Sequence, residues 1–156
     1  MRLASVIAAA LVLMAAPASA QAAREDAPAA DIQPRVDHHV RQASTQIEHF
    51  EALVAGDCPR FTSPNEWNAY ADGEIERIVL LVAHVEQAWV EAKRTGDDDV
   101  RRSAKVPRRR MDEAPQILTK LSACAETNGV TLEPGTVYRR IERELPRRQS
   151  EIALPR

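Results

Sequence analysis

Apolar residues recur at alternating spacings of four and three along the first long segment of this chain. Between 35 and 55 they are Val36, Val40, Ala43, Ile47, Phe50 and Val54, with Leu53 beside them. This alternation keeps side chains on one face of an α-helix, whereas a half-buried strand needs an apolar residue at every second position. We therefore expect a helix over 35–55, packed along one face and ended by Gly56.

A second helix is expected to begin at 63–66, where the sequence reads Ser-Pro-Asn-Glu. These residues supply an N-cap serine, a proline in the first turn and a glutamate that completes a capping box. The segment 78–85 is apolar nearly all round, so this helix should be the most buried. Its apolar residues again recur at spacings of four and three, and Gly96 is expected to end the helix. They are Ala71, Ile75, Ile78, Val82, Val85, Trp89 and Ala92.

Two further helices follow. The third should begin near 97–99, where three aspartates favour a helix start, and Pro107 and Pro115 then break it. The fourth should open at 133–136 and end or bend at Pro146. Helices joined by short loops favour an all-α fold, an antiparallel up-down four-helix bundle whose third helix is broken by prolines.

The two cysteines support this topology. In an up-down bundle the first and third helices run parallel, so Cys58, past the end of the first, and Cys124, near the end of the third, lie at one pole. We expect them to form one disulfide, which implies an oxidising compartment. The alternative is a reactive thiol at Cys58, which would need a lowered pKa. Because Asp57 lies beside it as well as Arg60, nothing obvious lowers the pKa of this thiol.

The N-terminus predicts a secretory signal peptide over 1–20. Arg2 precedes an apolar run that ends in Ala-Ser-Ala, and cleavage is expected after Ala20. The run is too short to be a membrane anchor, and the mature chain is expected to have no transmembrane span. Residues 21–34, rich in alanine and proline, predict a flexible leader before a helical bundle domain at 35–154. These features indicate a bacterial periplasmic or secreted protein.

Three of the four histidines lie between 37 and 50. On the expected first helix, His38 and His49 face solvent and His39 lies on the flank of the stripe, while His84 lies beside the apolar run of the second helix. We expect surface imidazoles that titrate near neutral pH. The alternative is a weak metal site formed by His39, His84 and a carboxylate, although a zinc site needs three or four ligands.

The two parts of the mature chain differ in charge. Residues 21–99 hold sixteen acidic and seven basic residues, whereas 100–156 hold seven acidic and thirteen basic residues. Either the acidic first two helices pair with the basic last two, or a basic patch binds an anionic partner such as lipid headgroups, polysaccharide or an acidic protein surface. The candidate binding residues are Arg101, Arg102, Lys105, Arg108, Arg109 and Arg110.

Catalytic and cofactor motifs are missing from the sequence. It has neither a Cys-x-x-Cys-His haem motif nor a Gly-x-Ser-x-Gly elbow, glycine-rich phosphate loop or calcium loop. We expect no cofactor, no catalytic residues and no nucleic acid partner. The leading hypothesis is a non-enzymatic protein that binds another macromolecule, as an adaptor, chaperone-like factor or inhibitor. The alternatives are a small helical enzyme with a dispersed charged active site, or a metal- or pH-responsive binder using His39 and His84.

Overall fold

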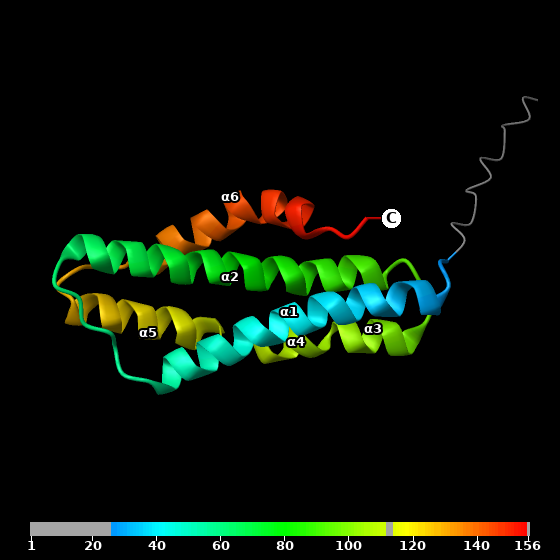
Figure 1. The fold of residues 1–156 in the computed structure, drawn as a ribbon, viewed down its shortest axis with the longest axis horizontal. Coiled ribbons are helices and arrows are strands. Elements are labelled where there is room, and N and C mark those ends of the chain that lie inside the picture. Colours follow the sequence, from blue (N-terminus) through cyan, green and yellow to red (C-terminus); the bar gives the residue numbers. More distant parts are fainter. Residues whose placement is uncertain (1–25, 112–113, 156) are drawn as a thin grey trace, which may run out of the picture.

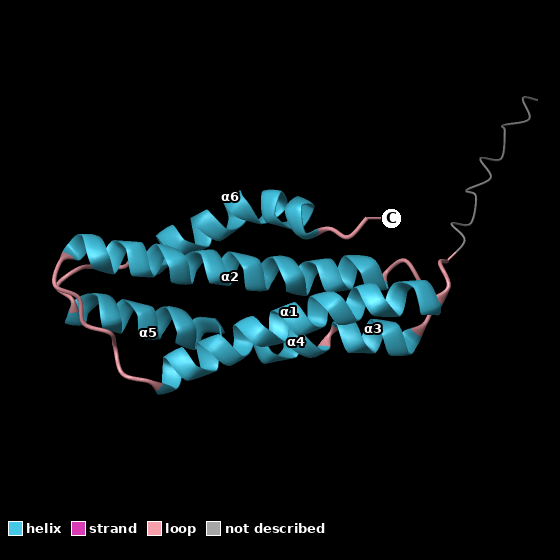
Figure 2. Cartoon of the chain, viewed as in Figure 1, coloured by secondary structure: helices cyan, strands magenta, loops and turns pink. Residues whose placement is uncertain are grey.

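The computed structural model describes residues 26–111 and 114–155, and these contain helices and loops but no strand (Figures 1 and 2). The helix expected at 35–55 is present, as is the one expected to begin at 63–66 and end by Gly96, and the broken third helix forms three shorter pieces. The six helices are α1 (Ala29–Ala55), α2 (Pro64–Ala92), α3 (Asp98–Ala104), α4 (Val106–Arg110), α5 (Ala114–Thr127) and α6 (Pro134–Ile152).

The helices form an antiparallel four-helix bundle, as the sequence predicts. The long helices α1 and α2 pack against each other in opposite directions, and α6 packs on α2 (Figure 1). The segments α3, α4 and α5 follow one another in the direction of α1 and together take the place of the third helix. Pro107 lies in the first turn of α4, where a missing N–H costs no helical hydrogen bond. None of the helices described is long and apolar enough to span a bilayer.

Helix α1 begins at Ala29, which corrects the expected boundary of the bundle at 35. Ile32 is buried beside Val36, in a cluster with Ala88, Ala92, Val100 and Ala104 from α2 and α3. The backbone N–H of Ala27 also donates to the carbonyl of Arg94 at 2.7 Å. Residues 27–34 therefore belong to the packed domain and are not part of a flexible leader. The expected signal peptide at 1–20 and residues 21–25 lie outside the described residues.

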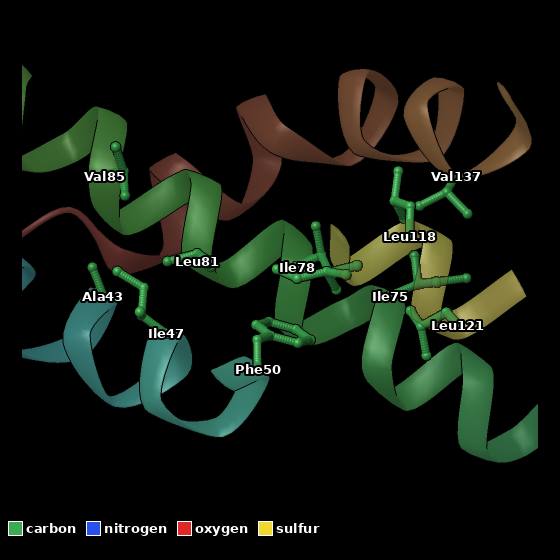
Figure 3. Close-up of a cluster of buried hydrophobic side chains, with 11 residues drawn as sticks. Ala43, Ile47, Phe50, Ile75, Ile78, Leu81, Val85, Leu118, Leu121 and Val137 are labelled. Carbon is green, nitrogen blue, oxygen red and sulfur yellow. The ribbon is translucent and has the colours of Figure 1, made fainter. Parts of the chain in front are cut away.

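The main hydrophobic core joins α1, α2, α5 and α6 (Figure 3). Phe50 of α1 and Leu121 of α5 are almost fully buried in it, and Val137 of α6 closes one end. The other members are Ala43, Ile47, Ile75, Ile78, Leu81, Val85, Ile117 and Leu118. Burial of these faces supplies the main stabilising free energy of a domain this size.

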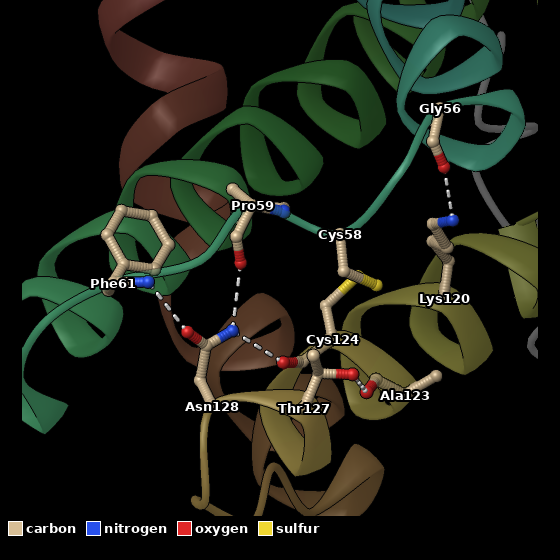
Figure 4. The surroundings of a disulfide bond; sticks show 9 residues. All are labelled: Gly56, Cys58, Pro59, Phe61, Lys120, Ala123, Cys124, Thr127 and Asn128. Carbon is tan, nitrogen blue, oxygen red and sulfur yellow. Dashed lines mark hydrogen bonds between the residues drawn. A yellow bond between two sulfur atoms is a disulfide. The ribbon is translucent and has the colours of Figure 1, made fainter.

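The disulfide between Cys58 and Cys124 is present and ties the loop after α1 to α5 (Figure 4). It excludes the reading of Cys58 as a reactive thiol. Asn128 holds the same loop in place, because its side-chain amide donates to the carbonyl of Pro59 and its oxygen accepts from the backbone N–H of Phe61.

Reduction of this disulfide should lower the free energy of unfolding by roughly 4 kcal/mol, because the cross-link closes a long loop in the unfolded chain. Urea denaturation with and without a thiol reductant measures the difference. A Cys58→Ala, Cys124→Ala variant serves as the control, since its unfolding should not respond to reductant. Equal unfolding midpoints for the oxidised and reduced wild-type protein would contradict the prediction.

Candidate functional site

His39 and His84 meet inside the bundle. His39 of α1 is 0% exposed and His84 of α2 is 5% exposed, and their Nδ1 atoms lie 3.0 Å apart. The expectation that these are solvated surface imidazoles is therefore wrong. The stripe that packs against α2 runs through Val36, His39 and Ala43, so His39 occupies a core position of α1.

Both imidazoles of this pair are electrically neutral at neutral pH. Burial lowers the pKa of His39 to about 4, and the nearby His84 and His38 rings oppose its charging as well. Burial also lowers the pKa of His84 to about 4, with His38 again opposing the charge. One ring donates its Nδ1 proton to the other, and Nε2 of His39 has no hydrogen-bond partner among the described residues. The expected titration near neutral pH is therefore wrong for these two residues.

The other two histidines are half-buried at the surface of the same seam. The ring centroid of His38 lies 5.1 Å from that of His39 and 6.2 Å from that of His84. His49 makes a 2.7 Å contact between its Nε2 and a carboxylate oxygen of Glu74, which links α1 to α2. Within 26–111 and 114–155, however, no three His, Cys, Asp or Glu side chains are arranged to hold a metal ion. A zinc site needs at least three such ligands, so the geometry does not favour the proposed His39–His84 metal site.

A charged cluster lies one to two turns from the histidine pair. Arg35 of α1 and Arg94 each approach Glu91 of α2 at 2.7 Å. Burial raises the pKa of Glu91, but hydrogen bonds from the two arginines outweigh it and lower the pKa to about 2. Arg35 also donates to the backbone carbonyls of Leu154 and Pro155 near the C-terminus. These groups line a hollow of about 550 Å³, where charged side chains converge.

The two basic segments of the sequence behave differently in the fold. On α6, Arg140 pairs with Asp72 of α2 and with Glu144 of α6 itself, and Arg148 pairs with Glu76 of α2. The basic side of α6 is therefore neutralised in part by the acidic α2 and in part by carboxylates of α6. These pairs match the first reading of the charge asymmetry, in which acidic and basic helices neutralise each other.

On α3 and α4, basic side chains gather at the surface around Trp89. A hollow of about 410 Å³ is lined by Trp89, Arg101, Arg102, Lys105 and Arg109, together with Asp98. The ammonium groups of Lys93 and Lys105 lie 5.3 and 5.1 Å from the centroid of the Trp89 ring, within the range of cation–π attraction. We call this surface the Trp89 face.

The structure thus brings together four of the six basic residues singled out in the sequence. Arg110 lies apart, paired with Glu51 of α1, and Arg108 is exposed but does not line the hollow. Trp89 was assigned to the apolar stripe of the second helix and was missed as a site residue. The signal that would have found it is its position, one turn before Lys93 and Arg94, which follow the end of α2.

Comparison with known proteins found no matching family model, no similar curated protein and no similar solved structure.

The buried imidazoles make the stability of the fold sensitive to acid. The folded-state pKa of His39 and His84 is about 4, whereas an unfolded chain takes up these protons near pH 6.5. Stability is therefore fully present above pH 6.5 and falls as the pH drops toward 4. Between pH 7 and 5 the loss should be on the order of 2 kcal/mol for each imidazole, less if the pair titrates as a unit.

Urea denaturation at pH 7 and pH 5 checks this expectation. A His39→Leu, His84→Leu variant should lose much of the decrease in stability between the two pH values, and a His38→Gln variant should retain it. If the wild-type protein and the double variant lose the same stability on acidification, the buried pair does not control the acid response.

Proposed function

We propose that this chain is a non-enzymatic protein of the periplasm or the extracellular medium that binds an acidic macromolecular partner through the Trp89 face. The observation that carries the proposal is the hollow beside Trp89, which is lined by four basic side chains and one acidic side chain. The partner we favour is an acidic protein surface, which suits an adaptor, a chaperone-like factor or an inhibitor.

The charges of this face support binding because little in the fold neutralises them. Arg102 pairs with Asp99, but both side chains are largely exposed, so this pair contributes little to stability. Among the described residues, no ion pair engages Arg101, Lys105 or Arg109. A concave surface with excess positive charge attracts acidic partners and raises their association rate.

The residue types on this face favour a protein partner. Tryptophan and arginine are enriched in the residues that dominate the free energy of protein–protein binding. Trp89 is half-buried, so its ring is held by the bundle while one part stays accessible. A rigid aromatic ring surrounded by flexible cations can pack against an apolar group while the cations pair with neighbouring carboxylates.

An extracytoplasmic location fits the covalent chemistry of the chain. Disulfides persist in oxidising compartments, and Cys58 and Cys124 are joined. The apolar run that ends at Ala20 is typical of a signal peptide, so the proposed mature chain begins at Gln21.

The ionisable groups of the interior favour binding over catalysis. The hollow beside Arg35 and Glu91 is where charged side chains converge, as an active site would require. A general base works best when its pKa lies near the working pH. The pKa of Glu91 is about 2 and those of His39 and His84 are about 4, which makes all three weak bases at neutral pH.

Charge reversal on the Trp89 face tests the proposal. A Lys105→Glu, Arg109→Glu variant should lose about tenfold in affinity for the partner, because both exposed cations would then repel its acidic groups. The measurement is capture of partner from periplasmic extract on immobilised mature protein, followed by titration of the identified protein at two salt concentrations. A variant with Arg143→Glu and Arg147→Glu on α6 has the same net charge and should bind within a factor of about two of wild type.

Equal affinity of the Trp89-face variant and wild type for the captured protein would contradict the proposal. Binding that weakens equally in both variants would also contradict it, because the effect would then follow net charge and not this surface.

A further inference from the structure

A cavity of about 180 Å³ lies between α1, α2, α4 and α5. Its inner wall is made by Ile47 and Phe50 of α1, Leu81 of α2 and Ile117 of α5, all of which are buried. Figure 3 shows Ile47, Phe50 and Leu81 on the facing sides of α1 and α2. Val54 and Met111 complete the apolar lining toward the surface.

The inner part of this cavity reaches into the apolar core, and its rim opens to the surface. Protein interiors are packed as densely as organic crystals, and their voids are mostly smaller than a water molecule. An apolar cavity of about 150 Å³ stays dry and takes up a benzene molecule. The cavity next to Phe50 is somewhat larger, so its interior matches one aromatic ring or a short acyl chain.

The rim of the cavity is polar on one side. Arg110 and Glu51 form an ion pair there, with side chains 39% and 45% exposed, and Gln116 lies beside them. A guanidinium group has five N–H donors in a planar fork that matches a carboxylate. Among the described residues that line the cavity, Arg110 is the only cation, so it is the group with which an anionic ligand would pair.

We propose that this cavity binds a small amphiphilic acid. The apolar end of the ligand, the size of a phenyl ring or a short acyl chain, occupies the space between Phe50, Leu81 and Ile117. Its carboxylate pairs with Arg110 at the rim and competes with Glu51 for the guanidinium group. This site is separate from the Trp89 face, because none of the residues of that face lines the cavity.

The test uses the mature protein and two probes of the same shape, 3-phenylpropionate and the neutral 3-phenylpropanol. Methyl NMR of Ile47, Leu81 and Ile117 reports binding. Both probes should shift these methyl signals in a saturable way, with dissociation constants on the order of 1 mM. The acid should bind more tightly than the alcohol.

Two variants separate the contributions of the ring and the carboxylate. Arg110→Gln should weaken binding of the acid about tenfold and leave the alcohol unchanged, because only the acid pairs with the guanidinium group. Val54→Phe should weaken both probes, because its ring fills the outer part of the cavity. Arg108→Gln is the matched control and should bind both probes as wild type does.

The proposal is overturned if neither probe shifts the cavity methyl signals in folded wild-type protein. It is also overturned if the acid binds Arg110→Gln as tightly as wild type, because the rim would then play no part in selecting the ligand. A Lys105→Glu, Arg109→Glu protein that loses its partner but still binds 3-phenylpropionate would show that the two sites fail or succeed independently.

Discussion

Along the seam between α1 and α2, Val36, Ala43 and Phe50 of one helix pack against buried aliphatic residues of the other, and the rest of the bundle is assembled on this pair. Helices α3, α4 and α5 lie against α1, while α6 lies against α2 (Figure 1). Most of the stability of a helix in a protein comes from packing of its apolar face, so the long helices depend on burying these faces against each other. The packing of α1 against α2 therefore provides the main stabilising contacts, and the surfaces and cavities of the protein depend on this pair of helices.

Polar contacts occur at intervals along the same seam. Arg35 pairs with Glu91, His39 with His84, and His49 with Glu74, each joining a residue of α1 to one of α2. A shift of one helix by a turn would leave these groups buried without partners, at a cost in free energy for each. The apolar contacts provide most of the stability, and the polar pairs disfavour other registers of the two helices.

Much of this fold follows from local signals in the sequence. Ser63 and Pro64 mark the beginning of α2, and Ser63 accepts the capping hydrogen bond from the backbone N–H of Glu66. Pro107 lies in the first turn of α4, just after the break between α3 and α4. The topology places Cys58 and Cys124 at the same pole. These features could be predicted because each depends on neighbouring residues or on the order of the helices alone.

The rest depends on how the helices pack. The start of α1 at Ala29 was missed because Pro28 and Pro34 read as a loop, although Ile32 has a buried place against α2 and α3. The stripe predicted for α1 includes Val40, which is half-buried, whereas the packing of the helix buries His39 fully. The basic residues of α6 reach acidic partners on α2 because α6 lies along α2. The cavity beside Phe50 forms only where four helices meet.

Nitrogen NMR of the imidazole side chains tests the central claim most directly, because it reports on two atoms that meet only if α1 and α2 pack in this register. At neutral pH, a coupling through the hydrogen bond should join Nδ1 of His39 to Nδ1 of His84, and the shared proton should exchange slowly with water. Two uncoupled imidazoles whose protons exchange freely with solvent would contradict the seam as described.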